Sequence, residues 1–305
     1  MTIVMMMILT FLYNNFINNR YLLNYIIYYM NKIAFLFLLY DKIQHQKLWE
    51  EFFSEDVNND KHTIYSHPKI VNDKTPSWIK KNKVRTIKTG WCSENLVKAL
   101  CNMLKKALKD KTNTHFVFLS GTCIPLYDFN NTYKKVTRVK KTRLNYFKSA
   151  VFGVKEDYIS SQWLILNRKV AKDLISLFEP NKRSKKFLRT QRKRYKDHGV
   201  KIIENKSYVF DDYKGEEYEW YGGCPDEIFP IEWFIKLYGK PSSQIFKKNI
   251  KSQVTTWILW DPTFTHPYII NKTQLKEWRK EMCTSNSIFA RKFTKGTAKL
   301  IGMKC

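Results

Sequence analysis

Two adjacent carboxylates, Asp226 and Glu227, follow a Gly-Gly-Cys-Pro segment and are the first candidates for acid–base chemistry in this sequence. The glycine pair favours a turn, and proline is common at the first position of a helix, so Pro225 predicts a helix start. A carboxylate on such a rigid element can serve as a general base if it reaches the attacking hydroxyl. Both acids can equally serve only to offset the helix dipole. The sequence leaves both interpretations open.

A second segment near the C-terminus places two cations between aromatic residues, in the order Phe289-Ala290-Arg291-Lys292-Phe293. A phosphate can be bound by Lys292 as a point charge and by Arg291 as a bidentate fork. The alternative is an amphipathic surface segment with both Phe side chains packed inward. Upstream, Trp260 is a candidate platform for stacking on a sugar, whereas core packing is the expected fate of Trp257.

Metal and cofactor motifs are missing from the sequence. The six His are scattered, and neither H-E-x-x-H nor D-x-D occurs, so that Asp211-Asp212 is the nearest acidic pair. The glycine patterns of P-loop and dinucleotide-binding proteins are absent too. We therefore expect no metal and no bound cofactor. If the substrate is a nucleotide diphosphate, Lys and Arg must neutralise its leaving group.

The charge balance allows a different class of function. Lys and Arg total 54 against 27 Asp and Glu, which gives a net charge of +27. Such an excess attracts nucleic acids and other polyanions. The alternative function is therefore a basic nucleic-acid-binding protein without enzymatic activity, using residues 134–143 and 181–201. These runs can also be solvated surface, and no RRM, KH, zinc-finger or helix-turn-helix signature accompanies them.

Apolar runs and helical periodicity alternate along the chain after residue 31. They predict a mainly parallel α/β sheet with helices on both faces. The expected strands are 33–39, 62–66, 84–87, 116–120 and 161–166, and the expected helices are 44–53, 93–108 and 170–178. Ligands of such sheets bind beyond the carboxyl ends of the strands. Residues 40–42, 66–69 and 120–123 should therefore surround one crevice.

The first thirty residues are apolar but interrupted by Asn14, Asn15, Asn18, Asn19 and Arg20. Neither half reaches the roughly 20 apolar residues that a spanning helix needs. Three interpretations stay open: a weak signal anchor, an interfacial segment, or an upstream extension with translation starting at Met30. Without a Gly/Ser linker further on, we expect a single domain over 31–305.

Several short segments occur in the order found in the core-2/I-branching family of glycosyltransferases, which includes plant and viral relatives. The matching segments are the strand and Leu-Trp-x-x-Phe helix of 33–53, Trp91-Cys92-Ser93 with Leu96-Val97-x-Ala99, Phe118–Leu126, Ser161-Gln162-Trp163, Cys224-Pro225-Asp226-Glu227, and Phe289–Phe293. The sequence resembles this family, of β-1,6-N-acetylglucosaminyltransferase type, over about 33–295.

The resemblance implies a GT-A-like fold and an inverting, metal-independent transfer from a nucleotide sugar to a glycan hydroxyl. It implies a UDP-linked donor of GlcNAc or xylose type and a glycan or glycoprotein acceptor. By the same resemblance Glu227 is the base and Lys292 meets the donor diphosphate, while Trp260 and Asp226 lie near the acceptor. If residues 1–30 are an anchor, the resemblance implies a type II protein of an ER- or Golgi-like membrane. If they are not, it implies a location in the host cytoplasm or in a viral factory.

Three positions depart from the family pattern. Many members have Asp at the position of Cys123, whereas the plant relatives have Cys there, as this sequence does. His266 or Arg291 must supply the second cation for the diphosphate, because the usual Arg is missing. His67 stands where an acidic residue often contacts the donor base, and we assign it to the donor nucleotide together with Ser120 and Gly121. A family fold that has lost activity and only binds glycans is therefore a third hypothesis.

Overall fold

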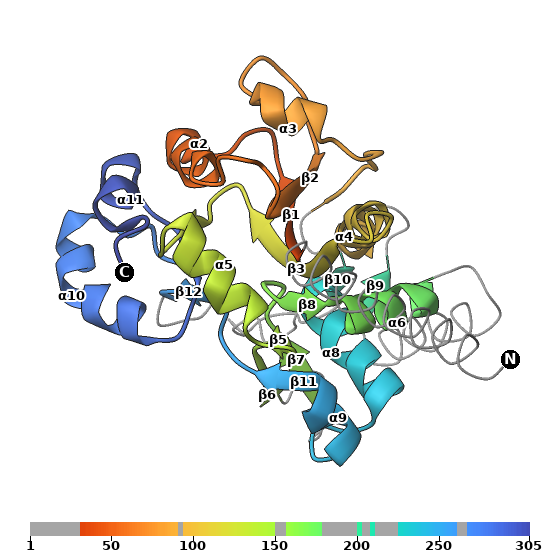
Figure 1. Ribbon diagram of the computed structural model, residues 1–305. Coiled ribbons are helices and arrows are strands. Elements are labelled where there is room, and N and C mark those ends of the chain that lie inside the picture. Colours follow the sequence, from red (N-terminus) through yellow and green to blue (C-terminus); the bar gives the residue numbers. More distant parts are fainter. Residues whose placement is uncertain are drawn as a thin grey trace, which may run out of the picture.

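A six-stranded sheet forms the centre of the computed structural model, which describes residues 31–90, 94–149, 157–178, 200–202, 208–210, 225–260 and 267–305 (Figure 1). Its strand order is β11-β5-β8-β3-β1-β2. β1 pairs in parallel with β2 and β3, and β11 pairs in parallel with β5. Only β8, between β3 and β5, runs antiparallel to its neighbours. The predicted mainly parallel sheet is confirmed.

The elements have the following bounds in the described residues. The strands are β1 (Lys32–Leu39), β2 (His62–Pro68), β3 (Asn113–Ser120), β4 (Ile124–Pro125), β5 (Thr142–Leu144), β6 (Tyr146–Ser149), β7 (Asp157–Ser160), β8 (Ile165–Asn167), β9 (Val200–Ile202), β10 (Tyr208–Phe210), β11 (Ile250–Ser252), β12 (Thr256–Ile258) and β13 (Phe289–Arg291). The helices are α2 (Gln46–Ser54), α3 (Ser77–Lys81), α4 (Glu94–Ala107), α5 (Phe129–Thr137), α6 (Arg168–Phe178), α8 (Pro225–Tyr238), α9 (Gln244–Asn249), α10 (Lys272–Thr284) and α11 (Lys295–Ile301).

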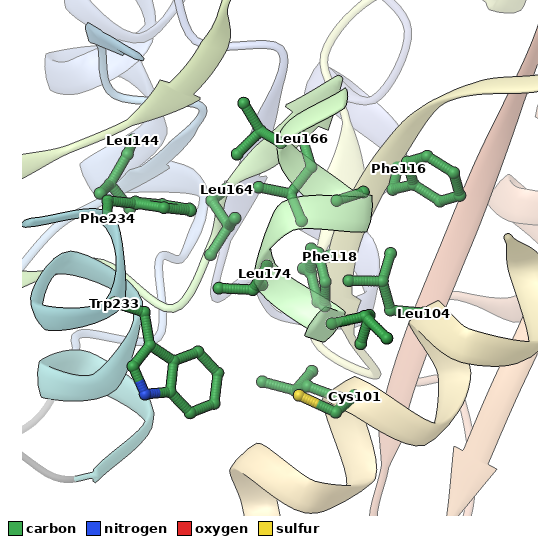
Figure 2. Close-up of a cluster of buried hydrophobic side chains, with 14 of the residues drawn as sticks. Cys101, Leu104, Phe116, Phe118, Leu144, Leu164, Leu166, Leu174, Trp233 and Phe234 are labelled. Carbon is green, nitrogen blue, oxygen red and sulfur yellow. The ribbon is translucent and has the colours of Figure 1, made fainter. Parts of the chain in front are cut away.

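Both faces of β1 are buried, because its side chains alternate between two apolar layers. Ala34 and Leu36 enter one layer, formed against α4, α6 and α8. Figure 2 shows the side chains that these helices contribute there, namely Cys101 and Leu104 from α4, Leu174 from α6, and Trp233 and Phe234 from α8. The continuous apolar run of β1 is therefore the pattern of a strand covered on both sides.

The other layer is aromatic. Phe35 and Phe37 from β1 meet Trp49, Phe52 and Phe53 of α2 with ring centroids 5.0–6.4 Å apart. All five pairs are edge-to-face, which is a favourable geometry for rings. This layer fixes α2 against the sheet and, through the start of α2, the segment that follows β1.

A smaller unit joins the C-terminal third of the chain to the sheet. Its sheet has the order β12-β13-β4, and α10 and α11 lie beside it (Figure 1). A disulfide links Cys283 at the end of α10 to Cys305, which the cysteine spacing did not predict. The backbone N–H of Cys305 donates to the carbonyl of Leu126 at 2.9 Å. The chain end is thus fixed beside β4.

Two predicted strands are wrong in this fold. Residues 84–87 form no strand, because pairing with β2 is limited to a single bridge between Lys83 and Ser66, and Ile87 bonds to the side chain of His67 instead of its backbone. The segment predicted as a strand at 161–166 bends at Gln162, and the strand begins only at Ile165. The other expected strands and helices are present, with ends that shift by a few residues.

The basic run at 134–143 is built partly into the fold. Arg143 on β5 is almost fully buried, and its guanidinium donates to the carbonyls of Lys135 and Val136 in the last turn of α5. A cation at the C-terminal end of a helix stabilises its free carbonyls. This Arg is therefore a helix cap and does not offer its charge to a ligand. Most of the second run, residues 181–199, lies outside the described residues.

The apolar segment 1–30 also lies outside the described residues, so its three interpretations and the domain boundary at residue 31 stay predictions. Within the described ranges, no helix combines the length and the apolar character needed to cross a bilayer.

Candidate active site

The two candidate carboxylates lie in the first turn of α8, which begins at Pro225 as predicted. Asp226 is buried, with 3% of its surface exposed, whereas Glu227 is half-buried. The hydroxyl of Ser160, at the end of β7, donates to the backbone carbonyl of Glu227 at 3.0 Å. This hydrogen bond fixes the start of α8 against the β6–β7 hairpin. The helix therefore positions Glu227 on a rigid backbone.

The second candidate segment forms β13 and the residues that follow it. Phe289 and Phe293 are buried, so the inward packing expected for an amphipathic segment is present. Arg291 points elsewhere: its guanidinium carbon lies 4.7 Å from the centre of the Trp163 ring. The carbonyl of Lys292 accepts a hydrogen bond from the N–H of Ile270 at 2.9 Å, which fixes the backbone next to its half-buried side chain.

Electrostatic interactions connect α8 and β13, although Glu227 and Arg291 lie 64 positions apart along the chain. The pKa of Asp226 is raised to about 7, mainly by burial and also by the negative charge of Glu227, while the charge of Arg291 opposes the rise. Burial lowers the pKa of Arg291, against the effect of both carboxylates. Burial and the neighbouring Arg291 lower the pKa of Lys292. The fold thus brings both predicted clusters into one electrostatic unit.

Two polar atoms of this unit are buried without a hydrogen-bond partner: Oδ1 of Asp226 and Nε of Arg291. Buried polar atoms in folded proteins are almost always hydrogen-bonded, and those that are not call for an explanation. Here an unpaired acceptor and an unpaired donor belong to two residues that interact electrostatically. Such unsatisfied groups are typical of sites where folding stability is given up for function.

The segments at the carboxyl ends of β1, β2 and β3, which were predicted to surround a crevice, are hydrogen-bonded to one another. The N–H of Lys69 donates to the carbonyl of Leu39 at 2.9 Å, and the N–H of Gln44 donates to the carbonyl of Gly121 at 2.8 Å. A Cβ on Gly121 would lie 2.5 Å from the carbonyl oxygen of Lys42. Only glycine permits this approach, so Gly121 has a packing role here.

Two polar side chains of these segments, His67 and Ser120, interact within the protein, although Nδ1 of His67 is buried without a partner. Nε2 of His67 accepts the N–H of Ile87 at 2.9 Å, and burial lowers the pKa of this imidazole. Oγ of Ser120 lies 3.0 Å from Oγ1 of Thr122 and 3.3 Å from Sγ of Cys123. Both side chains assigned to the donor nucleotide therefore stabilise the fold as well.

Cys123, in the turn after β3, interacts electrostatically with Arg291. Its side chain is fully buried, burial raises the pKa of its thiol, and the charge of Arg291 partly offsets that rise. Its carbonyl accepts the indole N–H of Trp49 at 2.9 Å. The residue that replaces the family's Asp is thus a packed, neutral side chain near Arg291.

The two tryptophans of 257–260 have different environments. Trp257 is buried and donates from Nε1 to Oε1 of Glu281 at 3.0 Å, as expected for a core residue. Trp260 is 37% exposed and bridges to Pro267, so its ring can be reached from solvent. His266 and the pair Asp211-Asp212 lie outside the described residues. Among the residues that are described, no cluster of three or more His, Cys, Asp or Glu could hold a metal ion.

Comparison with protein families matches residues 33–156 to the core-2/I-branching enzyme family. The predicted resemblance is confirmed. The family match includes β1 to β6 and the turn at Ser120–Cys123, and it ends before α8 and β13. Nothing in these comparisons supports the nucleic-acid alternative.

Glycosyltransferase BC10 from rice (Oryza sativa subsp. japonica) is similar to this chain, with 27% identity over 161 residues. The similarity covers 47% of this chain and 40% of the rice protein, so the chain matches less than half the length of that relative. Among solved structures, the crystal structure of A197 from STIV matches 46% of this chain and 67% of its own, at 11% identity. Its TM-score of 0.26 is too low to bear on fold or function.

One residue of the candidate site was missed. Trp163 belongs to a segment that resembles the core-2/I-branching family, but periodicity placed it in a strand and gave it no role in the site. The signal available was its family motif, Ser161-Gln162-Trp163. In the structure it is the aromatic surface against which Arg291 lies.

Proposed function

We propose that this chain is a glycosyltransferase that moves a sugar from a nucleotide-sugar donor to a glycan hydroxyl. One observation carries the proposal: in a chain with core-2/I-branching similarity, Glu227 interacts electrostatically with Arg291, and Arg291 with its neighbour Lys292. A carboxylate beside cations is what transfer to a hydroxyl with a phosphate leaving group requires.

In the proposed reaction Glu227 is the general base. It takes the proton from the acceptor hydroxyl while that oxygen forms a bond to the anomeric carbon of the donor. The bond from this carbon to the diphosphate oxygen breaks, and the diphosphate leaves with the electron pair. Attack opposite the leaving group inverts the anomeric centre. Half-burial leaves Glu227 accessible to an acceptor, whereas Asp226 beside it is sealed from solvent.

Lys292 supplies positive charge for the departing diphosphate. Its backbone is held by Ile270, and its side chain is half-buried, so its ammonium has a restricted range of positions. We propose that UDP is the nucleotide, that the donor is of GlcNAc or xylose type, and that no metal takes part. Trp260, with 37% of its surface exposed, is the proposed stacking surface for the acceptor glycan.

The base is tested with Glu227→Gln, which keeps the shape of the side chain and removes its basicity. Transfer should fall by at least about a hundredfold, the scale of general-base catalysis. UDP binding, measured by thermal shift, should change less than about threefold, because a bound ligand stabilises the native state regardless of turnover. Glu277→Gln, at an exposed site on α10, is the matched control and should keep full activity. Unchanged transfer by Glu227→Gln contradicts the assignment.

Donor and metal are tested on the unmodified chain. A panel of nucleotide sugars is screened by thermal shift, and each donor that stabilises the protein is assayed for transfer with EDTA and with Mn²⁺. Activity that persists in EDTA supports the metal-free mechanism, and a strict requirement for Mn²⁺ contradicts it. Glycan binding without transfer from any donor would instead support the hypothesis of an inactive binding protein.

A further inference from the structure

Two basic segments that are far apart in the sequence meet at the amino ends of β5 and β11. The ammonium of Lys141, just before β5, donates to the carbonyl of Lys247 on α9 at 2.9 Å. The two strands then pair in parallel, with Lys251 opposite Arg143. The end of α5, the start of β5, α9 and β11 therefore form one continuous surface, with α9 at the end of the molecule opposite α3 (Figure 1).

This surface, which we call the basic edge, carries positive charge without carboxylates of its own. Its exposed cations are Arg138, Lys140, Lys141, Lys247, Lys248 and Lys251. Residues 129–149 and 239–260 contain no Asp or Glu. On neighbouring elements, Asp56 is bonded to His62 and Asp110 to Thr112, so these two carboxylates already have partners. Like charge gathered in this way attracts a polyanionic surface.

The apolar segment 1–30 joins the described fold close to the basic edge. Asn31 directly precedes β1, and its carbonyl accepts the hydroxyl of Tyr133 on α5 at 2.7 Å. Arg138 follows Tyr133 at the end of the same helix. The carbonyl of Val139 lies 3.3 Å from Nε2 of His115 on β3, the strand beside β1. The chain therefore continues from this side of the sheet into the apolar segment.

The side chains of the basic edge favour a lipid surface over a nucleic acid. Five of its six cations are lysines, which act as point charges, whereas the planar fork of arginine is the better reader of nucleic acids. Ile245 on α9, two residues before Lys247, is 62% exposed. Stable attachment to a bilayer takes two signals, such as an apolar anchor and a polybasic patch. Both signals occur on this side of the sheet.

The basic edge lies away from the candidate active site. Glu227 is in the first turn of α8, and α9 follows the last turn of this 14-residue helix. At 1.5 Å per residue, α8 separates the two by about 20 Å. Because β5 and β3 both run antiparallel to β8, the amino end of β5 also points away from the carboxyl ends of β1 and β3. A surface bound at the basic edge would leave the site open to substrates.

We propose that the basic edge docks this chain on an anionic lipid bilayer, with its lysines against the charged headgroups and Ile245 in the headgroup layer. The inference goes beyond the proposed function and does not depend on it, because an inactive glycan-binding chain would dock in the same way. Its physical basis is the attraction between an anionic leaflet and a polybasic segment, which falls off within a Debye length.

Vesicle binding by the full chain tests the proposal. Partition is measured by co-sedimentation with phosphatidylcholine vesicles that contain about 30% phosphatidylserine. Pure phosphatidylcholine vesicles report what residues 1–30 contribute without charge. Combining Lys140→Gln, Lys247→Gln, Lys248→Gln and Lys251→Gln should lower the partition coefficient on the anionic vesicles by at least about a hundredfold. Raising NaCl from about 50 to about 500 mM should shrink the difference between the variant and the unmodified chain.

The matched control removes the same charge from exposed sites on α10 and α11, by combining Lys272→Gln, Lys276→Gln, Lys280→Gln and Lys299→Gln. Its partition coefficient on the anionic vesicles should fall less than about fivefold, because these lysines lie outside the basic edge. Ile245→Ser leaves the charge unchanged and should lower the coefficient by about threefold or more.

Lysine footprinting on the unmodified chain needs no variant to fold. The chain is acetylated with an N-hydroxysuccinimide ester in the presence of each kind of vesicle, and the sites are read by mass spectrometry. We expect Lys140, Lys247 and Lys248 to react at least about threefold more slowly with anionic vesicles present. Lys276 and Lys280 on α10 should react at an unchanged rate.

The inference is overturned if the two sets of Gln substitutions weaken binding equally, since total charge would then be responsible. Equal partition of the unmodified chain on neutral and anionic vesicles also overturns it. So does a footprint in which duplex DNA protects the basic edge and anionic vesicles do not. These measurements use no donor, so they stay decisive even if the chain transfers no sugar.

Discussion

The molecule has two polar corners near the candidate site, and they differ in the kind of polar group that is left without a partner. At the carboxyl ends of β1, β2 and β3, the side chains of His67 and Ser120 each interact within the protein, and the atom of these two that is buried without a partner is Nδ1 of the His67 imidazole. At the α8–β13 corner, Asp226 and Arg291 keep buried polar atoms without partners. Both corners were predicted from sequence as parts of one site.

This difference indicates that the first corner belongs to the scaffold and that the second corner holds groups that can take part in chemistry. A polar group that is already satisfied inside the protein gains little from a ligand, whereas fixed charges without partners are prepared for one. The first corner is therefore interpreted as a rigid scaffold, held by the close packing of Gly121 and by the backbone hydrogen bonds around it. The second corner holds the groups that we propose act on the substrate. Three experiments test this contrast.

The largest effect is expected for Gly121→Ala, if the first corner is a scaffold. The added Cβ would lie 2.5 Å from the carbonyl oxygen of Lys42, which is backbone and cannot move aside cheaply. We expect a loss of about 3 kcal/mol in the free energy of unfolding, the upper range for overpacking. Urea denaturation measures it.

Gly296→Ala is the control for that experiment, because an added Cβ on α11 meets nothing within 4 Å. In a helix this exchange should stabilise the protein by about 0.5 kcal/mol. Equal stability of the two variants would show that the close approach at Gly121 is unimportant and that the first corner is not a rigid scaffold.

An intermediate effect is expected on acidification. Burial lowers the pKa of His45, beside the first corner, and of His115, on β3, from 6.5 to about 4. Below pH 6.5 these two imidazoles therefore bind protons in the unfolded chain but not in the folded chain. The free energy of unfolding falls as a result when the pH drops from 6.5 to 4. Each ring should contribute on the order of 2 kcal/mol to this loss.

Thermal denaturation between pH 7 and pH 4 checks this slope. His45→Gln and His115→Gln should each flatten the acid-induced fall in Tm, whatever their effect at pH 7. A fall in Tm that is as steep in both variants as in the unmodified chain would contradict the assignment of these imidazoles.

The smallest effect is expected for Ser120→Ala. Its hydroxyl interacts with Thr122 and Cys123, so its removal should cost about 1 kcal/mol of stability or less. Because the hydroxyl is used within the protein, the Kd for UDP should change less than about threefold. A tenfold weaker Kd, measured by calorimetry, would place a donor contact in the first corner and break the contrast between the two.

Much of the fold could be predicted because its signals are local. The apolar run of β1 and the periodicity of α4 each follow from burial of neighbouring residues. The start of α8 at Pro225 follows from helix-end preferences. The segment at 84–87 failed because its backbone is held by single contacts, including the side chain of His67, that no local pattern records.

The candidate site was predictable in its residue types but not in its arrangement. Glu227, Arg291 and Lys292 were identified from their chemistry and from the family resemblance, yet their environments depend on distant segments. The burial of Asp226 and the stacking of Arg291 on Trp163 are set by how α8, β13 and the loop before β8 pack. Arg143 shows the converse, since a basic run that suggested a polyanion surface contains a helix cap.

Two free thiols in the described part of the chain, Cys101 and Cys123, have an experimental consequence. Cys101 is buried in the layer under α4 and α8, and Cys123 is buried on the opposite face of the sheet. Only thiolates react readily with alkylating reagents, and burial raises the pKa of both groups. Labelling at each position should therefore wait for a local opening event. The alkylation rates of these two thiols, followed by mass spectrometry, would measure how often the core opens locally on each face of the sheet.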